Sequence, residues 1–228
     1  MKNICILGAG SSSIKIIKEI ATQVNIGKIK DTINIKYGLI STNLEDIHRA
    51  QGYGLDILIN KKAESNEDVF EPVINRKITR EIEYLAIGDK ECNGLGTFAS
   101  IEKAEKAFFE SEKNIDAFLK QLLDEIDIVI FVASFGGGNG TGLIPLLAQK
   151  VKDMNINSIS IIGKPFDFEG KKRLETFNIG LENLKNRTNE IIIIDDTPIE
   201  KTLITTFEKR DLEFVKEAAN FIKELEKE

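Results

Sequence analysis

The sequence predicts an α/β fold, a three-layer sandwich in which helices cover both faces of a mostly parallel sheet. Short apolar runs alternate along the chain with amphipathic helical stretches, which is the pattern of strand–helix repeats. Several of these runs end in glycine-rich turns, and such sheets bind ligands beyond the carboxyl ends of their strands. A chain of 228 residues with 42% hydrophobic residues is long enough to bury one such core.

The composition argues against several functional classes. The net charge of −6 disfavours a nucleic-acid groove. The two cysteines, Cys5 and Cys92, stand at unrelated positions, which fits neither a disulfide framework nor a zinc site. No apolar run reaches membrane-spanning length, and Met1-Lys2 leads directly into a strand rather than a signal peptide. We therefore expect no nucleic-acid partner, no membrane insertion and a cytoplasmic location.

The first part of the chain predicts three strands and the turns that follow them. Asn3 to Leu7 is predicted to be a buried strand that ends in the glycine- and serine-rich turn Gly8–Ser13, with a helix after it. A second strand is expected from Ile33 to Ile40 and a third from Glu83 to Ile87. Residues 52–81 between them are irregular and charged, and we expect an insertion there.

The longest glycine run lies in the middle of the chain. An apolar strand, Ile128 to Ala133, precedes Gly136-Gly137-Gly138-Asn139-Gly140-Thr141-Gly142, and a helix is expected from Leu143 to Met154 with Pro145 in its first turn. Glycines let a ligand approach the backbone, and a helix N-terminus attracts anions. A Walker A lysine is absent, so the loop predicts a phosphate site that is held by backbone amides and hydroxyls.

The last part of the chain continues the alternation. Ser100 is expected to cap one long helix that runs to Leu123. A strand from Ser158 to Gly163 leads into the segment Lys164–Arg173, in which Glu169 offers a carboxylate and Arg173 a planar donor. A fully buried strand is expected from Ile191 to Ile194, and a last helix from about Lys201 to Lys227.

These motifs resemble those of the FtsZ/tubulin family. The central glycine run is similar to the family signature GGGTGTG, with Asn139 in place of a threonine, and Lys164–Arg173 closely resembles KPFxFEGxxR. Gly94-Leu95-Gly96 matches a further phosphate loop of the family, although Phe98 replaces a small residue. The resemblance covers residues 1–228 and implies one GTP-binding domain with a Rossmann-like sheet, a central helix at about 201–227 and no second domain.

The resemblance implies that GTP or GDP is bound, with Mg²⁺ as a candidate ion on the phosphates and no metal ligand from the chain. The residues implied for the phosphates are Gly8, Gly10, Ser11, Ser12, Ser13, Gly94, Gly96, Thr97, Gly136, Gly137, Gly138, Asn139, Gly140, Thr141 and Gly142. Those implied for the ribose and phosphate are Pro165, Glu169 and Arg173, and those for the base are Asp196, Phe207 and Asp211. Lys15 is either a further phosphate-binding charge or a solvated helix residue.

The carboxylate of Asp211 suits guanine, which offers a ring N–H and an amino group side by side. In the FtsZ family, a loop after the central helix supplies acidic residues that activate water at the next subunit's GTP, and the sequence ends at Glu228 without it. The resemblance therefore implies a relative of cytoskeletal and cell-division GTPases with no catalytic residue of its own and low intrinsic activity. Its expected partners are a guanine nucleotide and either itself or a full-length FtsZ-like protein.

The alternative function is a Rossmann-type NAD(P)-binding enzyme, because the first glycine turn also fits that class. Such an enzyme would place an acidic residue at the end of the second strand, where this sequence has Asn43. A purely structural module would bind no nucleotide at all.

Overall fold

The computed structural model describes residues 2–26, 33–48, 82–195, 200 and 202–225. Within them, six strands form one parallel sheet in the order β3-β2-β1-β4-β5-β6. The strands are β1 (Lys2–Ala9), β2 (Ile33–Ser41), β3 (Ile82–Ala86), β4 (Ile128–Ser134), β5 (Asn157–Gly163) and β6 (Glu190–Ile194). The predicted α/β sandwich with a parallel sheet is confirmed.

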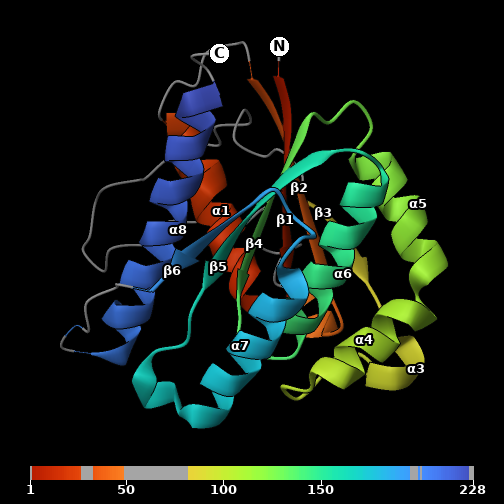
Figure 1. Cartoon of the computed structure of the whole chain (residues 1–228), viewed down its shortest axis with the longest axis vertical. Helices are drawn as coiled ribbons and strands as arrows, with labels where there is room; N and C mark the ends of the chain where they lie inside the picture. Colours follow the sequence, from red (N-terminus) through yellow and green to blue (C-terminus); the bar gives the residue numbers. More distant parts are fainter. Residues whose placement is uncertain (1, 27–32, 49–81, 196–199, 201, 226–228) are drawn as a thin grey trace, which may run out of the picture.

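Helices cover both faces of the sheet (Figure 1). They are α1 (Ser11–Ile26), α3 (Asp89–Cys92), α4 (Ile101–Glu110), α5 (Glu112–Leu122), α6 (Asn139–Asp153), the 3-10 turn η1 (Asp167–Glu169), α7 (Lys171–Leu184) and α8 (Leu203–Leu225). Figure 1 shows α1 and α8 together on one side of the sheet and α4 to α7 on the other. None of the helices in these described ranges is long and apolar enough to cross a membrane.

The period of two along β1 divides the core into two layers. Ile4 and Ile6 pack with residues of α1 and α8, including Phe214. Cys5 and Leu7 point to the opposite face, where they join the side chains of α4, α5, α6 and α7. Because both faces are covered, β1 is apolar from Ile4 to Ala9 rather than alternating.

The helix expected from Ser100 to Leu123 is two helices, so that prediction is wrong in one respect. Ser100 caps α4 as predicted, because its hydroxyl accepts a hydrogen bond from the Lys103 N–H at 3.1 Å. The chain then turns at Ser111, between α4 and α5, and its buried hydroxyl accepts from the Gly88 N–H at 2.9 Å. A serine that bonds to backbone outside its own helix favours such an interruption.

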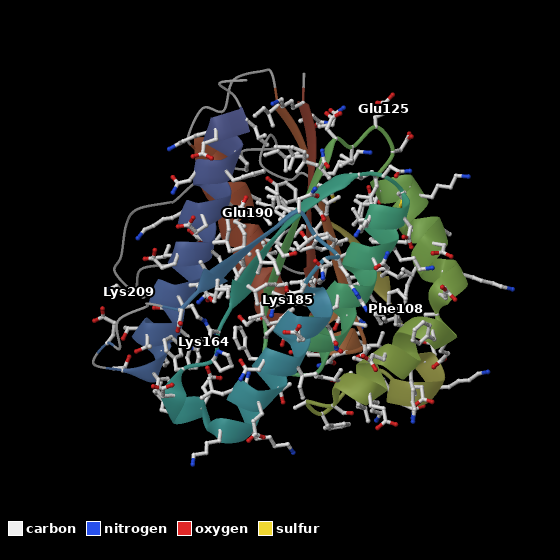
Figure 2. The ribbon with its side chains drawn as sticks, in the orientation of Figure 1. Phe108, Glu125, Lys164, Lys185, Glu190 and Lys209 are labelled. Carbon is white, nitrogen blue, oxygen red and sulfur yellow. The ribbon has the colours of Figure 1, made fainter. Side chains whose placement is uncertain are left out.

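The helices α4 and α5 turn one apolar face toward the sheet. The buried residues of this face include Ala104, Phe108, Ile115, Leu119 and Leu122. Phe108, labelled in Figure 2, is only 2% exposed. Ile101 and Phe118 are half-buried.

Two further expectations are corrected by the structure. The strand β6 is not fully buried, because it lies at the edge of the sheet and leaves Ile193 41% exposed. Helix α6 begins at Asn139 rather than Leu143, since the last residues of the glycine run are helical and the Gly142 N–H donates to the Gly138 carbonyl at 2.8 Å. Pro145 therefore lies inside α6 and not in its first turn. The predicted insertion at 52–81 lies outside the described residues.

Candidate functional site

The turns that follow the parallel strands meet at one edge of the sheet. In Figure 1, β4 and β5 run downward, and the start of α7 lies below their carboxyl ends. A Cβ added to Gly10, after β1, would lie 2.8 Å from the Cβ of Asn139, after β4. One added to Gly136 would lie 2.5 Å from the Cγ of Pro165 and 3.0 Å from the Arg173 carbonyl oxygen. The segments predicted to form one site are therefore in contact.

The first turn combines a fixed serine with two more accessible ones. Gly10 has φ of 79° and donates its N–H to the Ile40 carbonyl at 3.0 Å. The Ser13 hydroxyl is fully buried, lies 2.8 Å from the Val132 carbonyl oxygen and accepts from the Ala9 N–H at 3.1 Å. Ser11 is exposed and Ser12 half-buried. Ser13 therefore shapes this turn, and Ser11 and Ser12 remain the hydroxyls that a ligand could meet.

The glycine run after β4 is packed tightly at all but one of its non-helical positions. The Gly136 N–H donates to the hydroxyl of buried Thr141 at 2.9 Å, which fixes the turn at φ of 98°. A Cβ at Gly138 would collide with the Thr97 hydroxyl and lie 2.8 Å from the Ser100 carbonyl oxygen. At Gly137, a Cβ would meet nothing within 4 Å. Gly137 is therefore the position at which this turn is open.

The remaining glycines of the run serve packing. A Cβ at Gly140 would lie 2.7 Å from the Ser134 carbonyl oxygen, and one at Gly142 would lie 2.7 Å from the Ala104 Cβ. Both glycines belong to the first turn of α6, which carries no acidic residue. The N-terminus of this helix therefore keeps its positive potential at the site.

The Asn139 side chain joins the start of α6 to the end of β2. The Thr42 hydroxyl donates to the Asn139 amide oxygen at 2.7 Å, and the Asn139 amide nitrogen donates to the Ser41 hydroxyl at 3.3 Å. Ser41 in turn donates to the buried carboxylate of Asp46 at 2.7 Å. The amide that replaces the family's threonine thus anchors the glycine turn to the neighbouring strand.

The loop after α3 lies against the same strand end. Gly94 and Gly96 have φ of 72° and 82°, and the Gly96 N–H donates to the Thr42 carbonyl at 3.2 Å. Thr97 is buried against Gly138, whereas Phe98 is 76% exposed and its ring lies 5.2 Å from the Lys103 ammonium nitrogen. The bulky ring of Phe98 points outward and does not plug the site.

The segment after β5 holds Glu169 in a dense set of contacts. Its carboxylate accepts from the Phe166 N–H at 3.0 Å and pairs with the Arg173 Nε at 3.2 Å. A second guanidinium, that of Arg210 on α8, lies 3.5 Å from the same carboxylate. Only 10% of the Glu169 side chain is exposed.

The first turns of α8 carry an aromatic ring and a buried acid. The Phe207 ring lies edge-on to the Phe166 ring, with 5.5 Å between centroids. Burial raises the pKa of the Asp211 carboxyl, and Lys15 of α1, 3.1 Å away, opposes this rise. Lys15 therefore pairs with Asp211, the acid predicted for the base, and neither of the two roles expected for Lys15 included this pair.

Sequence reasoning missed Arg210, which is buried between Glu169 and two phenylalanine rings. The only feature of the sequence that could have indicated Arg210 is its position between Phe207 and Asp211, the two residues of this helix predicted for the base. Asp196, predicted for the base, lies outside the described residues. Asp195, the preceding residue in the sequence, pairs with Lys164 at 2.8 Å, which ties the ends of β5 and β6 together; Lys164 is labelled in Figure 2.

Curated relatives match part of this chain. It is 34% identical to the cell division protein FtsZ of Haemophilus influenzae over 117 residues, which are 51% of this chain and 27% of the relative. It is 33% identical to FtsZ of Aquifex aeolicus over 154 residues, or 64% of this chain and 41% of the relative. The chain thus covers less than half the length of these two relatives.

Solved structures match nearly the whole chain in fold. An FtsZ structure from M. jannaschii has a TM-score of 0.72 at 22% identity and covers 98% of this chain and 55% of that one. CetZ2 from Haloferax volcanii has a TM-score of 0.74 at 15% identity, and the match covers 97% of this chain and 58% of the CetZ2 chain. The sequence model of the Tubulin/FtsZ family, GTPase domain, matches residues 3–203, and the alternative of a Rossmann-type NAD(P) enzyme is not favoured. The chain belongs to the Tubulin/FtsZ family, as its GTPase domain.

Proposed function

We propose that this chain binds GTP or GDP along the edge of the sheet where the strands β1, β2, β4 and β5 end. The observation that carries the proposal is the open position at Gly137, where a Cβ would meet nothing within 4 Å, directly before the N-terminus of α6. Backbone N–H groups and the helix dipole together favour a phosphate there. Two family structures point the same way, since CetZ2 and CetZ1 of Haloferax volcanii are described as bound to GTPγS and GDP.

The phosphates would lie between the first turn and the glycine run. Gly10 and Asn139 bring these segments together, and Ser11 and Ser12 offer hydroxyls beside them. Ser13, Thr141 and Asn139 hold the backbone in place through buried or half-buried hydrogen bonds. Gly94, Gly96 and Thr97 close the same edge from the side of β2.

The nucleoside would lie toward α7 and α8. Glu169 and Arg173, which pair with each other, would meet the ribose and the nearest phosphate, and Phe207 and Asp211 would meet the base. Burial raises the pKa of the Asp211 carboxyl, and an acid perturbed in this way beside this edge of the sheet is a candidate for ligand binding. The N–H and amino groups of guanine are such a ligand.

Mg²⁺ would be held mainly by phosphate oxygens. In the part of the chain that the structure describes, no three His, Cys, Asp or Glu side chains form a group that could hold a metal ion. No metal ligand from the chain is proposed, so water would complete the coordination of the ion. The ion would neutralise phosphate charge when bound.

We also propose that residues 1–228 alone hydrolyse GTP slowly. Phosphoryl transfer to water needs a group that orients the water. The acids described around the site are Glu169 and Asp211, which are proposed for the ribose and the base, and Asp46, whose buried carboxylate accepts from Ser41. A second copy of this chain or an FtsZ-like protein is the proposed partner, since CetZ2 is described as a protofilament.

The direct test is thermal unfolding of the purified chain with GTP, GDP, ATP and NAD, each with Mg²⁺. Ligand at a hundred times its Kd adds about 2.7 kcal/mol to the free energy of unfolding. We expect this shift with GTP and GDP and little with ATP or NAD. A mass spectrum of any copurifying nucleotide and a phosphate-release assay complete the test. No shift with either guanine nucleotide would refute the binding proposal, and rapid turnover would refute the proposal of slow hydrolysis.

A further inference from the structure

We propose that Arg210 determines base specificity by donating a hydrogen bond to the carbonyl oxygen of the guanine ring. This inference rests on the proposed function, because it concerns the base end of the same site. Arg210 lies on α8 three residues after Phe207 and directly before Asp211. Residues three and four positions apart are neighbours on a helix surface, so Arg210 and Asp211 are each a neighbour of Phe207. The ring predicted to stack on the base is therefore flanked by a donor and an acceptor.

The guanidinium of Arg210 is held at the site by contacts on several sides. Its central carbon lies 5.0 Å from the centroid of the Phe207 ring and 5.1 Å from that of Phe166. One terminal nitrogen lies 3.5 Å from the Glu169 carboxylate, which is long for a direct hydrogen bond. The side chain is 9% exposed. Arg210 thus joins the residue proposed for the ribose to the ring proposed for the base.

One hydrogen-bond donor of Arg210 is not used within the described structure, although a terminal nitrogen pairs with Glu169. The buried Nε of Arg210 has no hydrogen-bond partner there. Burial lowers the pKa of the guanidinium, and the Glu169 carboxylate opposes that shift, so an arginine remains charged at neutral pH. A buried charged donor without an acceptor is unfavourable, and such a group calls for an explanation. A ligand oxygen between the two rings would supply the missing acceptor.

Guanine fits this arrangement of charges. Its 6-oxygen is an acceptor, and the adjacent ring N–H and 2-amino group are donors. Arg210 can donate to the oxygen while Asp211 accepts from the neighbouring N–H. Adenine presents an amino group and a ring lone pair in these places, so both contacts would be unfavourable. The pair therefore selects for guanine from two sides.

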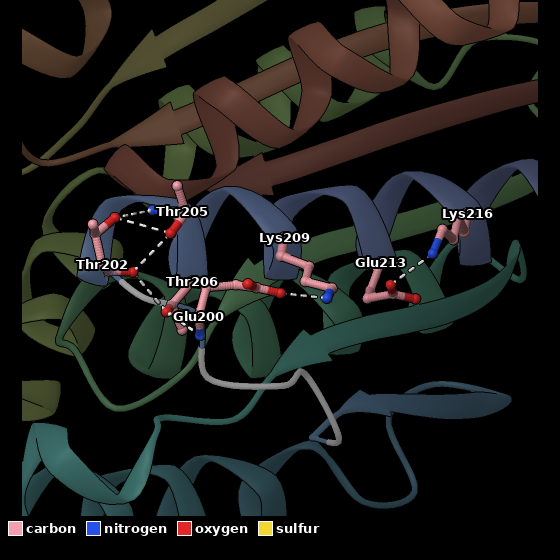
Figure 3. Close-up of polar contacts among 7 residues, drawn as sticks. All are labelled: Glu200, Thr202, Thr205, Thr206, Lys209, Glu213 and Lys216. Carbon is pink, nitrogen blue, oxygen red and sulfur yellow. Dashed lines mark hydrogen bonds and ion pairs between the residues drawn. The ribbon is translucent and has the colours of Figure 1, made fainter.

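The test compares wild type with Arg210→Met, which keeps an unbranched apolar stem but removes every donor. Lys209→Met is the matched control: it removes one positive charge from the adjacent residue, whose ammonium pairs with Glu200 (Figure 3). Binding of GTP, 6-thio-GTP and ITP is measured by isothermal titration. The thio analogue replaces the 6-oxygen by a poor acceptor, whereas ITP keeps the oxygen and lacks the 2-amino group.

We expect wild type and Lys209→Met to prefer GTP over 6-thio-GTP by about 10- to 100-fold, the size expected of a charge-assisted hydrogen bond. Arg210→Met should bind GTP weaker by a similar factor and lose this preference, while its ratio of GTP to ITP affinity stays unchanged. If Arg210→Met does not fold, Arg210→Lys keeps a cation between the rings without the planar fork and should show a reduced preference.

Three results would overturn the inference while leaving GTP binding intact. The first is an unchanged preference for GTP over 6-thio-GTP in Arg210→Met. The second is a changed ratio of GTP to 3′-deoxy-GTP affinity, which would mean that Arg210 acts on the ribose through Glu169. The third is tighter GTP binding by Arg210→Met, which would mean that the guanidinium occupies the place of the base. If wild type binds none of these nucleotides, the proposed function itself fails.

Discussion

Replacing Gly137 by alanine separates ligand binding from folding. A Cβ at this position meets nothing within 4 Å, and its φ lies outside the left-handed range that disfavours side chains. Gly137→Ala should therefore leave the free energy of unfolding unchanged or raise it by up to about 1 kcal/mol, since alanine restricts the unfolded chain. The new methyl group would occupy the space proposed for a phosphate. The variant should fold normally and bind GTP poorly.

The size of the effect on binding follows from linkage. In wild type, GTP at a hundred times its Kd should add about 2.7 kcal/mol, or about 5–10 °C in Tm for a chain of this size. In Gly137→Ala, we expect most of this shift to disappear at the same GTP concentration. Differential scanning fluorimetry with and without GTP measures both quantities. A GTP shift equal to that of wild type would refute the placement of phosphate against Gly137.

The neighbouring glycine supplies the control. At Gly138, a Cβ would collide with the Thr97 hydroxyl and lie 2.8 Å from the Ser100 carbonyl oxygen. Gly138→Ala should cost about 1–3 kcal/mol in the absence of nucleotide, the usual range for overpacking. Two adjacent glycine-to-alanine substitutions should thus have different effects: Gly137→Ala should weaken GTP binding, and Gly138→Ala should lower the free energy of unfolding. Equal stability of the two variants without ligand would contradict the described packing.

Three further predictions concern stability. Ser13→Ala removes a buried hydroxyl that bonds to the backbone of Ala9 and Val132 and should cost about 1–3 kcal/mol in urea unfolding, whereas Ser11→Ala should change it by less than about 0.5 kcal/mol. Phe214→Ala, at a fully buried ring, should cost about 3–5 kcal/mol by the same measurement. Burial raises the pKa of the Asp211 carboxyl in the folded protein above its ordinary value of 3.8. The protonated carboxyl therefore adds to the free energy of unfolding in full below pH 3.8, and this addition is lost as the pH rises through the pKa of the folded protein. Asp211→Asn should therefore unfold at a higher urea concentration than wild type at pH 7, and this difference should vanish below pH 3.8. Equal urea midpoints at pH 7 would contradict an upward shift of the Asp211 pKa.

The strands were predictable because both of their faces are buried. The run Ile128–Ala133 has no polar residue and lies at the centre of the sheet, between β1 and β5. Apolarity alone did not distinguish the centre from the edge, and Ile191–Ile194 was misjudged for that reason. The break at Ser111 was also invisible, because the apolar spacing continues across it and the hydrogen bond to Gly88 comes from a distant segment.

The glycine positions of the site were predictable, but their separate roles were not. The sequence shows that backbone must approach something closely at Gly136 to Gly142. It does not show whether that neighbour is a ligand or another part of the protein. In the structure, the space beside three of these glycines is occupied by other residues: Thr97 beside Gly138, Ser134 beside Gly140 and Ala104 beside Gly142. The space beside Gly137 is open. The two cases differ only in which residues from other parts of the sequence lie next to each glycine in the folded chain.

The balance of charge at the site explains how it could hold a polyphosphate without a lysine in its glycine run. Lys15, the cation nearest to the first turn in sequence, is paired with Asp211. Arg173 and Arg210 both face the single carboxylate of Glu169, so this group of three keeps one net positive charge close to Pro165 and the glycine run. Together with the start of α6, which has no acidic first turn, that charge favours an anion. The phosphates would then be positioned by backbone amides, and attracted by charge that the segment after β5 and helix α8 supply together.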